Sequence, residues 1–286
     1  MMRVAGNDME PHGQSPLTLV TAWFDLGRKQ TKYQGNPYPG WIRNFLPLVR
    51  WPLVIFCDEQ SLDMLKEARG DKPVVYRVTR PEEFYMYKYW SLLKEMEGEK
   101  PSAEVSLIWH EKHHFLRQTL LENPFDSEML FWCDMGMFRY RRDAPGWSAC
   151  RRQFRLFDDV EWPNLKVCRA LPQDKAILIY ARHTNAMCGG FFGGAVEPLR
   201  RWCDAYYRRV ERRVRKGTFI LSDEHVMFSC WRRQRELAHV LSGVNPFLIH
   251  LLKRGKHGAD FKWYFLNGKR FPWGYAFRRL FSGPAQ

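Results

Sequence analysis

The chain has 286 residues, 45% of them hydrophobic and 15% aromatic, so it can bury a substantial core, which excludes a disordered chain or a small repeat module. Its seven cysteines stand singly with no Cys-x-x-Cys pair, which excludes a zinc ribbon or a disulfide scaffold and favours a reducing compartment. The net charge of +14 comes from residues 139–286, which carry 29 Lys and Arg against 12 Asp and Glu, and it suggests nucleic acid, an anionic membrane or a phosphorylated substrate as a partner.

The start of the chain and its apolar runs bear on location. No run of 18 or more apolar residues is present, and residues 1–16 contain no apolar core of the signal-peptide kind. We therefore expect a soluble, cytoplasmic protein in which residues 1–16 form a flexible segment.

The first half alternates two kinds of pattern. Short apolar runs, each ending in polar or glycine residues, predict strands over 17–27, 52–60, 73–79 and 128–136. Helical spacing predicts helices over 40–50, 61–69, 81–97 and 103–121. Ser102 is the expected N-cap of the last of these helices. Strands that alternate with helices form βα units, so the sequence predicts an α/β fold with a Rossmann-type, mostly parallel sheet flanked by helices.

The second half has a different pattern. It predicts a strand over 176–182, a glycine-rich turn over 187–194, helices over 196–216 and 222–235, and a late strand over 260–266. We expect this half to complete the sheet of the first, giving a single domain over 17–266 followed by a basic aromatic tail over 267–286.

Acidic residues end two of the apolar strands. Asp58 follows one strand and Asp134 another, and in an open α/β sheet the ligand site lies at the carboxyl ends of the strands. Asp58 precedes a helix, which favours a helix cap. Asp134 precedes Met135 and Gly136, a turn where backbone can approach a ligand closely, which favours a functional role.

Four segments carry a resemblance to a known family. They are VTAWFDLGR, the aromatic stretch around Tyr38 and Trp41, LVIFCD, and NPFDSEMLFWCDMGMFR. Over roughly residues 17–265 the chain resembles the HtrL/YibB-like (WlaTC) glycosyltransferase family. The most specific element is a strand ending in Trp-x-Asp-x-Gly-x-x-Arg, matched by Trp132, Asp134, Gly136 and Arg139. Large DNA viruses of algae (chlorovirus type) encode similar-looking sugar transferases, for which a xylosyl donor is one possibility.

The resemblance implies a GT-A-like fold, in which residues 17–138 bind a nucleotide sugar and residues 139–266 bind the acceptor. The donor and its metal would be held by the loop after the first strand, by a lysine ahead of the metal strand, and by that strand itself. These residues are Thr21, Ala22, Phe24, Asp25, Arg28, Lys112, Trp132, Cys133, Asp134 and Gly136.

The expected cofactor is Mn²⁺ or Mg²⁺, which a strand-end carboxylate would hold against the diphosphate of a UDP-sugar, since these hard cations prefer oxygen ligands. The chain departs from the usual Asp-x-Asp of this fold, because Asp134-Met135-Gly136 has a single acid. His257, in a glycine-flanked loop, is the expected second metal ligand; the alternative for it is a solvated loop histidine.

Two further segments would serve the acceptor. The glycine-rich stretch is similar to the acceptor-side loop of GT-A enzymes, presenting Gly189, Gly190, Phe191, Phe192, Gly193 and Gly194 to a sugar; a tight turn without a ligand is the alternative. Glu224, or Asp223 as the fallback, would be the base that deprotonates the acceptor hydroxyl. Both acids would otherwise only stabilise the start of a helix that Ser222 caps.

Two other motifs have plainer interpretations. His110, His113 and His114 share a helix face without the order of a zinc protease, so we expect a solvated or partly buried face. The basic runs 208–216 and 231–235 suggest a solvated face or a peripheral contact with an anionic membrane, and no nucleic-acid-binding motif accompanies them.

The sequence therefore predicts a glycosyltransferase that moves a sugar from a nucleoside-diphosphate donor to a glycan hydroxyl, with inversion and with help from a divalent metal. The alternatives are a basic nucleic-acid-binding protein and a non-catalytic sugar-binding relative.

Overall fold

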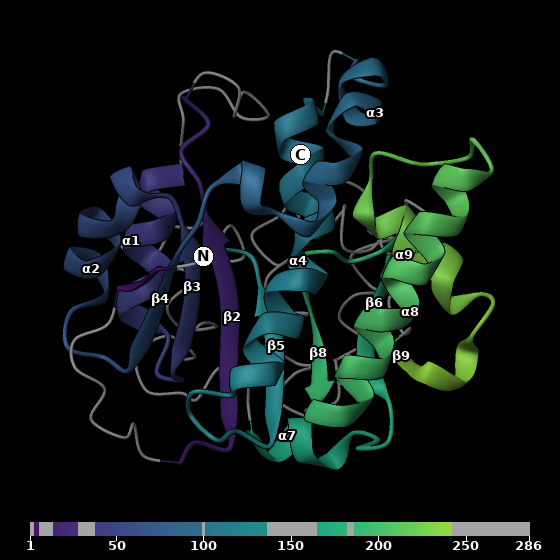
Figure 1. The fold of residues 1–286 in the computed structure, drawn as a ribbon. Coiled ribbons are helices and arrows are strands. Elements are labelled where there is room, and N and C mark those ends of the chain that lie inside the picture. The colour runs from purple at the N-terminus through teal and green to yellow at the C-terminus, as the bar shows by residue number, and fades with distance from the viewer. Residues whose placement is uncertain are drawn as a thin grey trace, which may run out of the picture.

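A computed structural model describes residues 3–5, 14–27, 38–98, 101–135, 165–181 and 186–241, and its sheet runs through both halves of the chain (Figure 1). The strands are β1 (Arg3–Ala5), β2 (Leu17–Trp23), β3 (Leu53–Cys57), β4 (Val74–Val78), β5 (Met129–Cys133), β6 (Ala176–Ala181), β7 (Ala186–Met187), β8 (Phe191–Ala195) and β9 (Ala238–Leu241). The helices are α1 (Tyr38–Leu48), α2 (Leu62–Arg69), α3 (Trp90–Glu95), α4 (Ala103–Glu122), α7 (Leu165–Ala170), α8 (Val196–Arg215) and α9 (Asp223–Trp231).

The sheet has the order β1-β4-β3-β2-β5-β8-β6-β7, with β9 beside β6. Its centre, from β4 to β5, is parallel, whereas β1 and β8 join that centre in antiparallel fashion. The expected α/β fold with a mostly parallel sheet flanked by helices is confirmed. Because the four central strands run the same way, their carboxyl ends meet at one edge, where ligands bind in sheets of this type.

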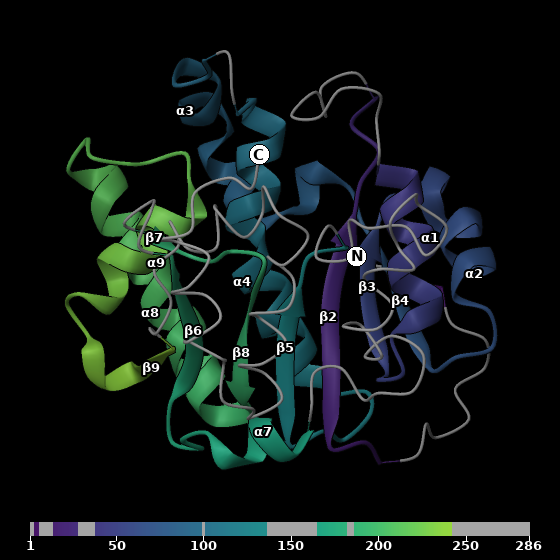
Figure 2. The same ribbon diagram turned by 180° about the vertical axis from the view of Figure 1, so that it is seen from behind.

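Helices cover both faces of the sheet (Figures 1 and 2). On one face α4 and α8 pack against β2, β5 and β8 through a core that includes Trp132, Phe192 and Trp202, and α9 packs against α8 and β7. On the other face α1, α2 and α7 enclose a second core. Since each strand alternates its side chains between two apolar layers, the central strands are buried on both faces, as parallel strands are.

The prediction that residues 187–194 form a glycine-rich turn is only partly correct, because most of the segment is strand. The turn comes first, at Gly189 and Gly190, and Phe191–Ala195 then form β8 beside β5. A Cβ atom on Gly193 would collide with the backbone of Leu130 and Phe131, so this close pairing requires glycine.

The single helix predicted over 81–97 is wrong. The structure has two 3-10 turns, Pro81–Glu83 and Tyr85–Tyr89, before the short helix α3. Phe84 between the turns has extended backbone, and the N–H groups of Tyr85 and Met86 donate to the Glu111 carboxylate at 2.8 and 3.0 Å. The carboxylate from α4 replaces the helical acceptors that these two amides would otherwise use.

Helix α4 confirms its predicted start, since the Ser102 hydroxyl accepts from the Val105 N–H at 3.3 Å. The side of α4 that carries the histidines is more deeply buried than the sequence predicts. His110 and His113 are fully buried, and the His113 ring stacks on Tyr206 with centroids 3.5 Å apart. Burial lowers the pKa of His110 to about 4, so this face is neutral and apolar in character.

Some predictions fall outside the described residues, namely the late strand 260–266 and the tail 267–286. Within the described part, β1, β7, β8 and β9 are strands that the sequence did not indicate. None of the described helices is both long enough and apolar enough to cross a membrane.

Candidate active site

Asp134 directly follows β5, at the edge where the parallel strands end. Its side chain is 39% exposed, and its Oδ1 accepts a hydrogen bond of 2.7 Å from the indole N–H of Trp132. The Asp134 N–H donates to the carbonyl of Gly190 at 2.9 Å, which ties the strand end to the glycine turn. Asp134 is thus a carboxylate held in one orientation with part of its surface open.

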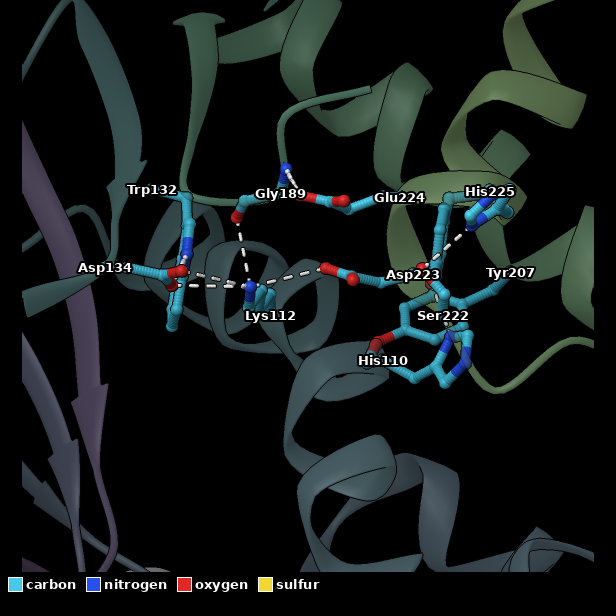
Figure 3. A network of polar contacts seen from close by, with 11 residues as sticks. His110, Lys112, Trp132, Asp134, Gly189, Tyr207, Ser222, Asp223, Glu224 and His225 are labelled. Carbon is cyan, nitrogen blue, oxygen red and sulfur yellow. Dashed lines mark hydrogen bonds and ion pairs between the residues drawn. The ribbon is translucent and has the colours of Figure 1, made fainter. Parts of the chain in front are cut away.

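Lys112 reaches this carboxylate from α4 (Figure 3). Its Nζ lies 3.3 Å from Asp134 Oδ1 and 3.3 Å from Asp223 Oδ2, and it donates to the Gly189 carbonyl at 3.0 Å. Burial would lower the pKa of this ammonium, but the negative charges of Asp134, Asp223 and Glu224 outweigh burial and raise it. Lys112 donates hydrogen bonds to Asp134 and to the Gly189 carbonyl and forms ion pairs with Asp134 and Asp223, so it connects β5, the glycine turn and α9.

Two acids enter the cluster from the start of α9, and they differ in access. The Asp223 side chain is 3% exposed and faces Lys112. Glu224 is only partly buried, and its Oε1 accepts from the Gly189 N–H at 2.9 Å. Burial raises the pKa of Asp223 to about 6, with Lys112 acting in the opposite direction and Glu224 adding to the rise.

Ser222 precedes α9 as predicted, but its hydroxyl makes no capping bond and lies 3.1 Å from His225 Nδ1. The prediction that the Ser222 side chain caps this helix is therefore wrong.

Gly189 lies in contact with both acids of α9 and with Lys112. A Cβ atom there would lie 2.7 Å from Asp223 Oδ2 and 3.1 Å from Glu224 Cγ. Only glycine lets the turn pass so close to both acids while its N–H and carbonyl bind Glu224 and Lys112. The β7–β8 turn, α4, β5 and α9 thus meet at one point.

The loop after β2 reaches the same edge of the sheet. Thr21 and Phe24 are buried, whereas Ala22 is partly exposed and Asp25 is exposed. The Asp25 N–H donates to Asp58 Oδ2 at 2.6 Å, and Asp58 also accepts from the Ser61 N–H at 2.8 Å. The cap interpretation of Asp58 is confirmed, and Ala22 and Asp25 are the members of this loop that a ligand can reach.

The remaining predicted site residues divide into two groups. Cys133, Trp132, Phe191 and Phe192 have buried side chains, and Gly193 and Gly194 lie within β8, so of the glycine-rich segment only the Gly189-Gly190 turn lies in the cluster. Arg28, Gly136 and His257 lie outside the described residues.

The acidic side chains of the cluster can be compared with what the predicted Mn²⁺ or Mg²⁺ would need as ligands. Over the described residues, no three His, Cys, Asp or Glu side chains are arranged to hold a metal ion. Formal charges in the cluster nevertheless leave two negative charges in excess, since Asp134, Asp223 and Glu224 surround Lys112 alone. Mg²⁺-like cations commonly take one protein carboxylate and complete their shell with phosphate and water. The partly exposed Asp134 fits such a single ligand.

The sequence missed the connection that Lys112 makes. Lys112 was expected only through the family resemblance, whereas the structure joins it to Asp134 and to Asp223, which lies 111 positions further along the chain. The available signal was a lysine in the middle of a helix between Leu107 and Phe115, both of which are core residues.

Comparison with known proteins gives little further guidance. No protein-family model matches the chain, and no curated protein matches its sequence. One solved structure to which it is similar is the crystal structure of mouse xyloside xylosyltransferase 1 in its apo form. The similarity covers 79% of this chain and 85% of that chain, with 14% identity and a TM-score of 0.43. At such a TM-score, function has to be argued from the residues of the site.

Proposed function

We propose that this protein is a glycosyltransferase that moves a sugar from a nucleoside-diphosphate donor to a glycan hydroxyl. The observation that carries the proposal is the Asp134 carboxylate, partly open at the carboxyl end of a central parallel strand and fixed from behind by Trp132 and Lys112. The sequence resemblance to the HtrL/YibB-like family supports a GT-A-like enzyme and a UDP-sugar, with UDP-xylose or a UDP-hexose as the first donors to test.

The charge of the cluster supports a donor that arrives with a cation. A diphosphate would be repelled by two excess negative charges, and a divalent cation bound at this site would offset that repulsion. Mn²⁺ or Mg²⁺ would supply Lewis-acid stabilisation of the charge that develops on the departing diphosphate. Asp134 would hold it, with His257 as the second ligand expected from the sequence.

Glu224 is the better candidate for the base. It is more accessible than Asp223, and the Gly189 N–H fixes one of its oxygens while the other remains for the acceptor hydroxyl. In an inverting reaction Glu224 takes the proton, the acceptor oxygen bonds to the anomeric carbon, and the bond from that carbon to the diphosphate oxygen breaks. Asp223 is committed to Lys112 and positions the cluster.

The test is release of UDP from a panel of UDP-sugars in the presence of glycan acceptors and Mn²⁺. With Glu224→Gln we expect turnover to fall by about 10²–10⁴, the usual scale for loss of a general base, while donor affinity stays near that of the parent. Glu236→Gln, an exposed acid beyond α9, is the matched control and should keep full turnover.

Other outcomes contradict parts of the proposal. Normal turnover in Glu224→Gln would move the base to another group, with Asp223→Asn the next variant to assay. UDP binding by the parent without transfer from any donor would instead favour a non-catalytic sugar-binding protein.

A further inference from the structure

A second charged cluster lies between α8 and α9, which are neighbours at the edge of the molecule (Figures 1 and 2). Arg209 and Arg213 are one turn apart on α8, on the side that faces Ser229 of α9. Arg233 follows the end of α9, one turn beyond Ser229, and its charge acts on both arginines of α8. We call Arg209, Arg213, Ser229 and Arg233 the arginine cluster.

The serine at its centre is surrounded by more donors than a hydroxyl can accept well. Ser229 Oγ accepts from Arg209 Nε at 2.8 Å, from Arg209 Nη2, and from Arg213 Nη1 at 3.2 Å. A hydroxyl oxygen has two lone pairs, so three guanidinium N–H groups exceed its capacity. Arg213 Nε is closed off from solvent and has no hydrogen-bond acceptor among the described residues. The cluster therefore has one buried donor without an acceptor and one serine hydroxyl shared by three guanidinium N–H groups.

The positive charges of the arginine cluster also have no carboxylate to neutralise them among the described residues. In the part of the chain that the structure describes, no carboxylate forms an ion pair with Arg209, Arg213 or Arg233. The acids nearest along α8 are engaged elsewhere: Glu211 binds Tyr85 and Lys88, and Asp204 lies by Arg117 and Arg200. Burial and then the charge of Arg233 lower the pKa of both Arg209 and Arg213. Their charged forms are therefore less favourable here than in water.

We propose that the arginine cluster is a binding site for a phosphate group. Guanidinium groups match phosphate oxygens through paired N–H donors, and the Ser229 hydroxyl can turn to donate to the same anion. A bound phosphate supplies the acceptors and the negative charge that the cluster lacks. The site lies toward the end of α9, whereas Asp223 and Glu224 are at its start, so the proposal does not depend on the proposed transferase activity.

The phosphate has two possible sources with the same chemistry, a phospholipid headgroup or a soluble phosphate. The aromatic rings of Phe228 and Trp231 lie beside the cluster, each with an arginine over its face, Arg232 and Arg235 respectively. Aromatic and basic side chains together are typical of protein surfaces that meet anionic membranes, so the headgroup is included in the test.

The experiment measures binding of the full-length protein to inorganic phosphate by calorimetry, and to vesicles of phosphatidylglycerol or phosphatidylcholine by co-sedimentation. Arg233→Gln is the first variant, because the guanidinium of Arg233 is exposed and donates to no described residue, so its loss leaves the fold intact. Arg213→Gln is the second. Each should weaken binding on the order of tenfold, as expected for a lost charge-assisted hydrogen bond.

Arg201→Gln, which removes the same charge from an exposed position in the first half of α8, is the matched control and should bind like the parent. Arg213→Lys keeps the charge but loses the paired donors, and weaker binding by it supports a built site. Binding of free phosphate identifies a soluble source, and binding of phosphatidylglycerol vesicles alone identifies a headgroup. Equal losses in Arg201→Gln and Arg233→Gln, or no binding by the parent in either assay, would overturn the proposal.

Discussion

The two charged clusters at opposite ends of α9 balance their charges in opposite ways. At the start of the helix one buried ammonium, Lys112, forms ion pairs with Asp134 and Asp223 and donates to the Gly189 carbonyl. Toward the end, Arg209, Arg213 and Arg233 gather around Ser229 without a described carboxylate partner. In the first cluster a buried cation offsets the charge of the acids around it, whereas in the second the cations have no described counter-charge, which is why we propose an anionic ligand there.

Removal of one cation from each cluster should affect stability very differently. Lys112→Met should lower the free energy of unfolding at pH 7 by about 3–5 kcal/mol, because it leaves the buried Asp223 without its counter-charge. Arg233→Gln should change it by less than about 0.5 kcal/mol, because no described partner is lost. Urea unfolding of both variants beside the parent measures the difference.

Equal effects of the two substitutions would contradict the account. A small loss in Lys112→Met would mean that the ammonium is not the group that holds the acids together. A large loss in Arg233→Gln would mean that the arginine cluster is part of the folded framework rather than an open site.

A smaller effect concerns pH. Asp223 has a pKa of about 6 in the folded protein against 3.8 as its ordinary value, so the folded state binds more protons between these values. The free energy of unfolding contributed by this group therefore falls as pH rises from about 4 to about 6 and is constant above that. His110 and His114, whose pKa values are lowered to about 4, act in the opposite direction over the same range.

The difference between the parent and Asp223→Asn isolates the Asp223 contribution. Denaturant unfolding from pH 4 to pH 7 should show stability of the parent declining relative to the variant up to about pH 6. Arg233→Gln, which leaves Asp223 and its surroundings unchanged, gives the contrast and should show no such difference. A parallel course of parent and Asp223→Asn would rule out a raised pKa at Asp223.

The features that sequence could predict are those set by neighbouring residues. Alternating apolar runs and helical spacing predicted the central parallel strands, the start of α4 at Ser102 and the place of Asp134 after β5. The acids at the start of α9 were also found, because first-turn acids next to a serine are a local pattern.

What sequence could not predict depends on contacts between distant segments. The single helix over 81–97 fails because Glu111, from another helix, takes the amides of Tyr85 and Met86. The glycine turn is confined to Gly189 and Gly190 because the residues after them pair with β5. The role of Lys112 depends on its contact with Asp223 of α9, which lies more than a hundred residues further along the chain. The periodicity of apolar residues along the chain gives no information on contacts between distant segments.

The proposed function requires that the partly exposed Asp134 carboxylate takes part in binding a nucleoside diphosphate. Calorimetric titration of UDP into the protein, with and without Mn²⁺, tests this without requiring the acceptor. We predict binding that Mn²⁺ strengthens, and in Asp134→Asn the loss of the part that depends on Mn²⁺. Asp126→Asn, an exposed acid that precedes β5, should bind like the parent. Identical Mn²⁺-dependent binding of UDP by the parent and by Asp134→Asn would contradict the account.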